Sequence, residues 1–421
     1  MRILILYDTV YPDFIGGVEH RNYELAEALA RRGHEVTLGG LCAGSRQAAP
    51  NLRVECFGPI GKLYNERGQR SSRQALRFAG IVTRLDVRPY DIVETANIPY
   101  LHLPILALKC LLRRKPLVVA WHAHWGAYWR DYIGTWIWPV YYLIEWLAAQ
   151  FGSGVVAVST MTAGRVAAQR LRGRVAVLPN GIPLARIQAA MGPHPPTPSP
   201  IPSQPPGEGE KSSTSIEGAG RVEAPLSRRS GGDGRGDGGE GPPIFFAGRL
   251  TRERRLDLLL RAVQALGPAP DEVLLAIAGK GPALDSLRSL AAELGIAGNV
   301  VFHGLLTSDR LFREMARSRV AVQPSSQDSF GLFPLEAMAT GLPVVYCKAP
   351  DSALPELVRD DREGFGVEAD PEAIAAALRR LLGDGGLWER LHAGALARAR
   401  EYDWDHIVLR AEELYRGMLA C

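Results

Sequence analysis

The sequence predicts an α/β protein with two domains, each built around a doubly wound parallel sheet. The chain has 421 residues, which exceeds the usual size of one domain. Hydrophobic residues make up 46% of it, enough to fill two cores. Short apolar runs typical of buried strands alternate with helical patterns on both sides of a Pro- and Gly-rich segment. Because the alternation occurs on both sides, two sheets are expected rather than one.

The first half begins with a strand at residues 2–7 and continues through a glycine-containing loop into a helix at residues 18–32. Leu25, Ala26 and Leu29 share one face of that helix, and Gly33 ends it. Further apolar runs predict strands at residues 35–38, 91–94, 116–120, 154–158 and 175–178. We therefore expect an N-terminal domain over residues 1–190.

A change in composition follows. Residues 194–243 contain no aromatic side chain, and the segment is Pro-rich at its start and Gly-rich at its end. Such a segment buries too little surface to offset the entropy of ordering it. The sequence therefore predicts a disordered linker or insertion over residues 191–243.

The alternation resumes after this segment. Strands are predicted at residues 244–247, 273–278, 300–303, 320–323 and 344–346, with helices at 256–266, 283–294 and 311–317. We expect a second domain over residues 244–400, followed by a C-terminal helix over residues 401–421. Ligands of such folds bind at the carboxyl ends of the strands, here in the cleft between the domains.

The charge balance limits the class of partner. The chain carries 49 Lys and Arg against 45 Asp and Glu, a formal net charge of +4, and it has no long basic run. No nucleic-acid partner is therefore expected. A diphosphate ligand or an anionic membrane surface is compatible with this balance.

The cysteines and the N-terminus bear on the compartment. Five cysteines at positions 42, 56, 110, 347 and 421 show neither zinc-ligand nor CxxC spacing, which indicates free thiols in a reducing compartment. The first residues run directly into a strand pattern without a signal-peptide core, and no window is apolar enough to span a membrane. We expect a cytoplasmic protein that can also bind the inner face of the cell membrane peripherally.

Three loops after predicted strands carry glycines or arginines. These residues are Gly16 and Gly17 after the first strand, Arg249 and Arg254 after the strand at 244–247, and Gly279 and Gly281 after the strand at 273–278. Glycines let backbone amides approach an anion, and arginines can hold a diphosphate. Each signal is weak by itself, because Gly-Gly is usually a turn and a basic loop is usually solvated.

The most informative stretch runs from Pro324 to Pro343. It follows a buried strand, turns at Phe330-Gly331-Leu332, and is expected to enter a helix near Pro334. Asp328 lies in the loop and Glu336 in the predicted first turn of the helix. Carboxylates there are also ordinary partners of a helix dipole.

Together these motifs resemble the retaining glycosyltransferases of family 4, also called glycosyl transferases group 1, which have the GT-B fold of two Rossmann-like domains facing across a cleft. The resemblance covers nearly all of the chain outside residues 194–243. It implies that residues 1–190 form the acceptor-side domain, that residues 244–400 form the nucleotide-sugar donor domain, and that the helix at 401–421 crosses back to the first domain. It rests on the order of the motifs: Gly16-Gly17, Trp121-His122, Val158-Ser159, Pro179-Asn180-Gly181-Ile182, Gly248-Arg249-Leu250 with Arg254, the acidic pair Asp328 and Glu336, and the aromatic turn at Tyr402-Asp403-Trp404.

The resemblance implies a role for each matched position. Gly16 and Gly17 would offer amides to the donor phosphate or the transferred sugar, and the amides of Phe330, Gly331 and Leu332 would assist Asp328. Gly279 and Gly281 are expected to bring backbone close to the ligand, since their loop lacks the spacing of a phosphate loop. Arg249 and Arg254 would neutralise a leaving diphosphate. His122 and Asp328 would contact the donor sugar, and Glu336 would bind the ribose. The donor would be a UDP- or GDP-sugar, with no cofactor and no metal, and the acceptor a glycan, a lipid-linked molecule or a small molecule.

The chain departs from the family pattern at three places. Asp328 is one methylene shorter than the usual Glu, and Arg254 replaces a Lys. The expected Gly-Gly before Pro355-Glu356 is Ser352-Ala353-Leu354. The changes at Asp328 and before Pro355 keep a non-catalytic nucleotide-sugar binder open as an alternative. The shared architecture keeps open another GT-B enzyme, such as a nucleotide-sugar epimerase.

The acceptor side is marked by aromatic residues. Six of the eight tryptophans lie between Trp121 and Trp146, and the basic cluster Arg113-Arg114-Lys115 lies just upstream. Aromatic and basic side chains together are typical of a membrane surface or an acceptor platform. Core packing explains them equally well.

Overall fold

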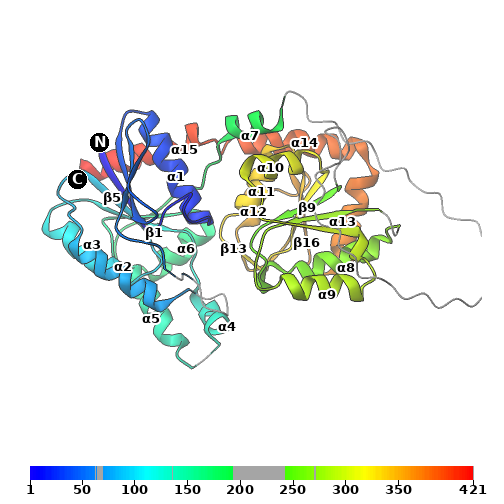
Figure 1. Cartoon of the computed structure of the whole chain (residues 1–421), viewed down its shortest axis with the longest axis horizontal. Helices are drawn as coiled ribbons and strands as arrows, with labels where there is room; N and C mark the ends of the chain where they lie inside the picture. Colours follow the sequence, from blue (N-terminus) through cyan, green and yellow to red (C-terminus); the bar gives the residue numbers. More distant parts are fainter. Residues whose placement is uncertain (62, 64–69, 135, 193–241, 270–271, 421) are drawn as a thin grey trace, which may run out of the picture.

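The computed structural model describes residues 1–61, 63, 70–134, 136–192, 242–269 and 272–420. They form two α/β domains that lie side by side, as expected from the sequence (Figure 1). The linker expected over residues 191–243 lies almost wholly outside the described residues.

The first domain holds an eight-stranded sheet with the order β3-β4-β2-β1-β5-β6-β7-β8. All neighbouring strands are parallel except β3, which is antiparallel to β4. The strands are β1 (Arg2–Thr9), β2 (Glu35–Leu41), β3 (Arg46–Ala49), β4 (Leu52–Cys56), β5 (Ile92–Ala96), β6 (Leu117–Trp121), β7 (Gly154–Ala157) and β8 (Val175–Val177).

Helices cover both faces of this sheet because successive strand residues point to opposite sides. Ile3 and Ile5 of β1 pack in one core with helices α1 (Gly17–Arg31) and α15 (Trp404–Leu419). Leu4 and Leu6 pack in the opposite core. That core is covered by α2 (Ser72–Arg84), α3 (Leu103–Leu112), α4 (Trp129–Ile133), α5 (Trp138–Ala148) and α6 (Thr160–Gln169).

The second domain holds a six-stranded sheet, all of whose neighbouring strands are parallel, with the order β11-β10-β9-β12-β14-β16. Its strands are β9 (Ile244–Ala247), β10 (Leu275–Ala278), β11 (Val300–Gly304), β12 (Val320–Gln323), β14 (Val344–Cys347) and β16 (Gly364–Val367). A small pair, β13 (Gln327–Asp328) and β15 (Asp351–Ser352), lies apart from the sheet.

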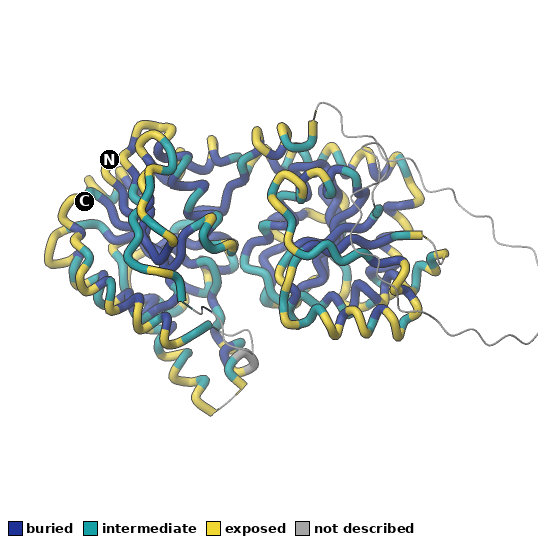
Figure 2. The backbone as a smooth tube through the Cα atoms, in the orientation of Figure 1, coloured by how far each residue is buried: buried dark blue, intermediate teal, exposed yellow. Residues whose placement is uncertain are grey.

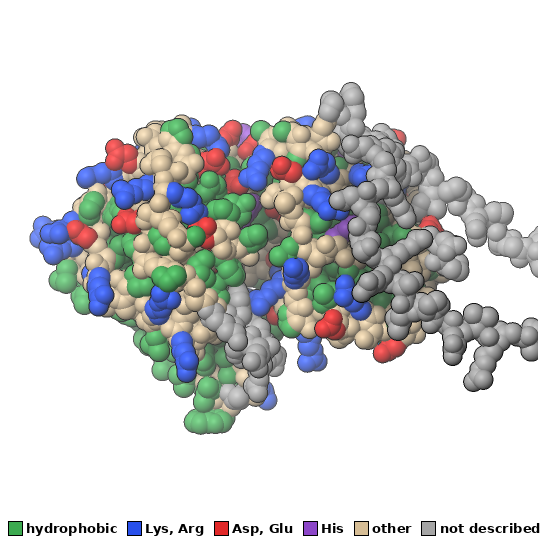
Figure 3. Space-filling model, viewed as in Figure 1, with side chains coloured by type: hydrophobic (Ala, Val, Ile, Leu, Met, Phe, Trp, Pro, Cys, Tyr) green, Lys and Arg blue, Asp and Glu red, His purple; other side chains and the backbone are tan. Residues whose placement is uncertain are grey.

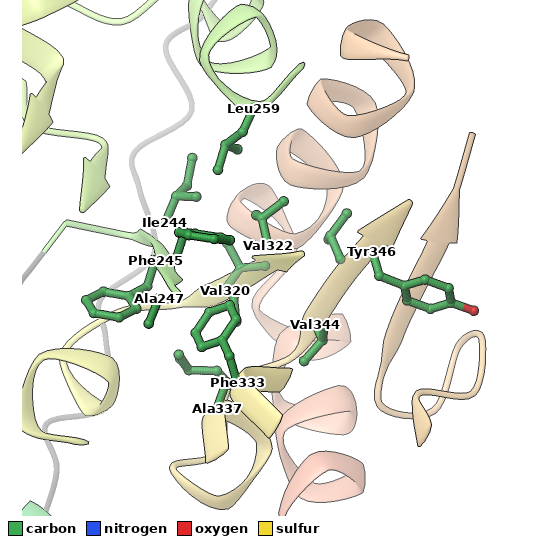
Figure 4. Close-up of a cluster of buried hydrophobic side chains, with 14 of the residues drawn as sticks. Ile244, Phe245, Ala247, Leu259, Val320, Val322, Phe333, Ala337, Val344 and Tyr346 are labelled. Carbon is green, nitrogen blue, oxygen red and sulfur yellow. The ribbon is translucent and has the colours of Figure 1, made fainter. Parts of the chain in front are cut away.

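The helices of the second domain pack on this sheet. They are α8 (Leu256–Leu266), α9 (Leu284–Glu293), α10 (Ser308–Ala316), α11 (Leu332–Ala339), α12 (Leu354–Leu357), α13 (Pro371–Gly383) and α14 (Gly385–Arg400). Phe333 of α11 reaches the rings of Phe245 and Phe246 at centroid distances of 6.4 and 5.6 Å, in the core shown in Figure 4. The segment that carries the acidic pair is therefore anchored in the core.

The chain crosses between the domains at two adjacent points. Ile182 and Asp403 form an isolated bridge, in which the amide of Trp404 donates to the carbonyl of Ile182 at 3.1 Å. Helix α7 (Leu184–Met191) packs against α10 and α11 of the second domain, so the first crossing lies before the expected boundary at residue 190. Helix α15 then lies on the first domain against α1. In Figure 2 the strands of both domains are buried and the outer helix faces are exposed.

Candidate active site

The glycine loop of the first domain faces the second domain. Gly16 is the N-cap of α1, and a Cβ there would lie 2.3 Å from Oε2 of Glu19, so a side chain at this position would require the Glu19 carboxylate to move. A Cβ on Gly17 would lie 3.5 Å from Cδ1 of Leu332. The loop after β1 therefore meets the beginning of α11 where the two domains touch.

The stretch from Pro324 to Pro343 turns at Gly331. This residue has φ 96°, and a Cβ there would lie 2.5 Å from Cδ2 of Leu354, so both backbone and packing require glycine. Because Gly331 caps the helix, α11 begins at Leu332, two residues before the expected start near Pro334. The prediction that Glu336 lies in the first turn was wrong, since it is the fifth residue of the helix.

Asp328 and Arg254 form an ion pair. Nη1 of Arg254 lies 2.9 Å from Oδ2 of Asp328 and also donates to Oγ of Ser325 at 3.3 Å. The carboxylate accepts two more hydrogen bonds, from Nε2 of Gln323 at 2.7 Å and from the amide of Phe330 at 3.2 Å. The shortened acid is thus held by three donors, and the sequence did not indicate this pairing.

Glu336 lies half-buried near a second carboxylate from the first domain. Burial, followed by the negative charge of Glu24 on α1, raises the pKa of Glu336 to about 8. Burial and the neighbouring Glu27 raise the pKa of Glu24 itself to about 7. Arg186 of α7 lies 3.5 Å from the Glu24 carboxylate and provides a partial counter-charge.

The two loops of the second domain that carry glycines pack backbone against backbone. A Cβ on Gly279 would lie 1.9 Å from the carbonyl oxygen of Gly248, and a Cβ on Gly281 would lie 2.1 Å from that of Leu250. The loop that bears the exposed Arg249 is therefore fixed by the loop after β10. Close approach of backbones explains these glycines better than a phosphate loop does.

His122 follows β6 in the first domain. Its amide donates to Oδ1 of Asn97 at 3.4 Å, and its Nε2 has no hydrogen-bond partner among the described residues. Burial, with a smaller contribution from the charge of Arg21, lowers the pKa of His122 well below its usual range. The ring is therefore neutral near pH 7. Among the described residues, no hydrogen bond or ion pair joins it to the second domain.

One buried acid, Glu145, holds part of the aromatic cluster. The carboxylate of Glu145 accepts hydrogen bonds from the amides of Trp125 and Gly126 at 2.9 and 2.7 Å, from Nε1 of Trp129 at 3.1 Å and from the hydroxyl of Tyr100 at 2.9 Å. His124 lies 3.8 Å from the same acid, so it is a structural neighbour. Trp136 differs, because 87% of it is exposed.

Sequence reasoning missed the charged residues of α1. Arg21 is buried and paired with Glu94 of β5, whose other oxygen accepts the hydroxyl of Tyr415 from α15. Glu24 is also buried, and its charge acts on Glu336 of the second domain. A signal was present, since Arg21 lies four residues before Leu25 and so shares the buried face of the helix.

The site therefore combines residues of both domains. The structure brings Gly17 to Leu332, Asp328 to Arg254, and Gly279 and Gly281 to the loop of Arg249. The described residues contain no group of three or more His, Cys, Asp or Glu that could hold a metal ion. Within the same residues, no helix is long and apolar enough to cross a bilayer.

Comparison with known proteins agrees with this arrangement. The family model described as Glycosyltransferase Family 4 matches residues 15–186, and the model described as Glycosyl transferases group 1 matches residues 241–384. The chain belongs to this glycosyltransferase family. The matches cover the glycine loop in one domain and the acidic pair in the other, which confirms the resemblance inferred from the motifs.

Curated relatives of this family-4 chain match part of its length. A D-inositol 3-phosphate glycosyltransferase from Streptomyces griseus subsp. griseus is 38% identical over 186 residues, which is 42% of this chain and 39% of the relative. An uncharacterised glycosyltransferase from Methanocaldococcus jannaschii is 34% identical over 175 residues, 41% of this chain and 44% of the relative. The chain thus spans about two fifths of the length of the curated relatives it matches.

Solved structures share the fold of the family-4 chain over its whole length. Sucrose-phosphate synthase from Thermosynechococcus elongatus superposes with a TM-score of 0.71 at 18% identity and covers 100% of this chain and 99% of that one. Anabaena HepE in complex with UDP and glucose gives 0.66 at 18% identity, with 99% and 100% coverage. At such identities the likeness concerns the GT-B fold alone.

Proposed function

We propose that the chain transfers a hexose from a nucleotide-diphosphate sugar to a hydroxyl group of an acceptor, with retention of configuration. The proposal rests mainly on the contact between Gly17 and Leu332, in which a Cβ on Gly17 would lie 3.5 Å from Cδ1 of Leu332. It places an open backbone loop of one domain against the segment that holds Asp328 and Glu336 in the other. A donor in this cleft would contact both domains at once.

The proposed chemistry rests on positioning and on stabilising the leaving group. Arg249, Arg254 and the amides at the start of α11 would face the departing diphosphate. Glu336 would accept the ribose hydroxyls, and the neutral His122 would face the donor sugar. In a retaining reaction of this kind, the acceptor hydroxyl attacks on the face that the diphosphate leaves and gives its proton to a phosphate oxygen. We propose no metal requirement, because the arginines and amides supply the positive charge.

Asp328 has a particular part in this proposal. Its Oδ2 is held by Arg254 and Gln323 in the ligand-free protein. When Arg254 turns to a bound diphosphate, Oδ2 loses one donor and can accept a sugar hydroxyl instead. If Arg254 and Asp328 stay paired when the donor binds, the Asp328 carboxylate keeps its three protein donors. That outcome favours the second candidate, a nucleotide-sugar binder without transferase activity.

Donor binding followed by turnover tests the function. A panel of UDP- and GDP-sugars is screened by thermal shift, and slow hydrolysis of the best donor is then followed without acceptor. We expect one donor to raise the melting temperature and to be hydrolysed, and Glu336→Ala to abolish the shift while the exposed Glu389→Ala leaves it unchanged. Binding without hydrolysis or transfer would identify a binder, and no shift with any donor would refute the proposal.

We further propose that the acceptor is lipid-linked, or a growing surface polysaccharide, and that the protein meets it at an anionic membrane. On α5 and the turn before it, Trp136, Leu143 and Leu147 are 87%, 53% and 44% exposed. Hydrophobic side chains gather at that end of the first domain in Figure 3. The exposed cations Arg113 and Arg114 follow α3 on the same face of the sheet.

Co-sedimentation with liposomes tests the membrane contact. We expect binding to vesicles rich in phosphatidylglycerol and little binding to phosphatidylcholine vesicles at low salt. Leu143→Glu should weaken the binding, whereas Leu409→Glu on α15, also an exposed leucine, should not. Equal sedimentation of both variants would refute this surface.

A further inference from the structure

The two domains share a second contact, between the N-terminus of α6 and helix α12. The carboxylate of Glu356 accepts the amide hydrogens of Thr160 at 2.7 Å and Met161 at 2.6 Å. Ser159, the N-cap, accepts the amide of Thr162 at 3.2 Å. The first three amides of α6 are thus all satisfied, two of them by an acid of the other domain, which is the charge a helix N-terminus favours.

A second hydrogen-bonded group strengthens this contact. Arg165 lies further along α6, and its guanidinium reaches a carboxylate oxygen of Asp351 at 2.7 Å and the carbonyl of Pro350 at 2.9 Å. Arg398 of α14 donates to the carbonyl of Glu356 at 2.8 Å, which connects α12 to α14 within the second domain. Both ends of the segment 350–356 are therefore bonded to helix α6.

The same segment is tied to the acidic loop of the site. Strand β15 pairs with β13, with Ser352 opposite Asp328. The amide of Ala353 donates to the carbonyl of Asp328 at 2.7 Å. Ser352 and Ala353 are buried, so this segment is a packed connection where the family pattern has two glycines.

We infer that Glu356 and Arg165 are positioning residues, which dock segment 350–356 on α6 and so fix the backbone of Asp328 relative to the first domain. This inference rests on the proposed function, in which Asp328 contacts the donor sugar. Glu356 itself is exposed, and an exposed contact of this kind is weak enough to break when the domains separate to release product.

Hydrogen exchange at single-residue resolution tests the docking without any assay of activity. Arg165→Met leaves Glu356, the acceptor of the Thr160 and Met161 amides, in place. If all bonds of the contact form and break together, this variant should still speed the exchange of those two amides about tenfold. Glu356→Gln should speed exchange of the Ala353 amide by a similar factor. Glu372→Gln, on the exposed side of α13, is the matched control and should change neither.

Kinetics supply the second readout. For Glu356→Gln we expect kcat/KM for the donor to fall about tenfold, with most of the change in kcat and a melting temperature close to that of the wild type. An unchanged exchange rate of the Ala353 amide in Glu356→Gln would overturn the inference, whether or not kcat/KM falls. If the wild type transfers no sugar, the proposed function fails, and the exchange data alone then decide whether the docking exists.

Discussion

Changing the pH from 6 to 8.5 should strengthen donor binding, because Glu336 is the ribose acceptor in our proposal and only its ionised form accepts two hydroxyl hydrogens. Burial and the charge of Glu24 raise the pKa of Glu336 to about 8. Donor binding therefore has to remove a proton that the free protein holds near neutral pH.

The magnitude follows from this value. At pH 7 a group with a pKa of about 8 is roughly one-tenth ionised, and at pH 6 roughly one-hundredth. Apparent affinity is reduced by the competent fraction, so the dissociation constant should fall about tenfold per pH unit below 8 and level off above it. Glu24→Gln removes the neighbouring charge and should move the rise to lower pH.

Isothermal titration calorimetry with a nucleotide sugar measures this dependence. A nucleotide sugar is preferable to free UDP, whose terminal phosphate titrates in the same range. The donor with the largest thermal shift is titrated at several pH values into wild type, Glu336→Gln and Glu24→Gln. Glu336→Gln should bind weakly with no pH dependence, and a flat or falling affinity of the wild type would refute the assigned role.

Folding stability should respond to the same group in the opposite direction. A raised carboxyl pKa means that the folded protein holds the proton more tightly than the unfolded chain does. The stabilisation from Glu336 is present in full below the ordinary pKa of 4.5 and is lost as the pH rises through about 8. Glu336→Gln should therefore gain in melting temperature over the wild type between pH 6 and 8.5. A constant difference would show that the pKa is not raised.

Two further predictions concern the second domain. Arg254→Met removes the partner of Asp328 and a charge facing the diphosphate, and should weaken donor binding about 10- to 100-fold by calorimetry. Arg255→Met, which loses the half-buried partner Asp257, should bind normally. Gly279→Ala would place a Cβ 1.9 Å from a carbonyl oxygen and should lower the melting temperature markedly, whereas Gly383→Ala, with open space around it, should not; equal melting temperatures would contradict the backbone contact.

Much of the fold was predictable because each buried strand is a short apolar run. The strands Ile244–Ala247 and Val320–Gln323 and the helix Leu256–Leu266 have the predicted bounds. The short strands Arg46–Ala49 and Leu52–Cys56 were missed, since their sequences carry charges and only two of their side chains are buried. Sheet neighbours, not local pattern, make them strands.

The architecture and the residue types of the proposed site could be inferred from the sequence, because periodicity and glycine placement are local properties. Which residues meet depends on tertiary packing. Arg254 pairs with Asp328 across 74 positions, and Glu356 caps a helix that begins 196 positions earlier. The pKa of Glu336 likewise depends on Glu24, a residue of the other domain. Such contacts form between residues that are far apart in the sequence, so the spacing of residues along the chain does not predict them.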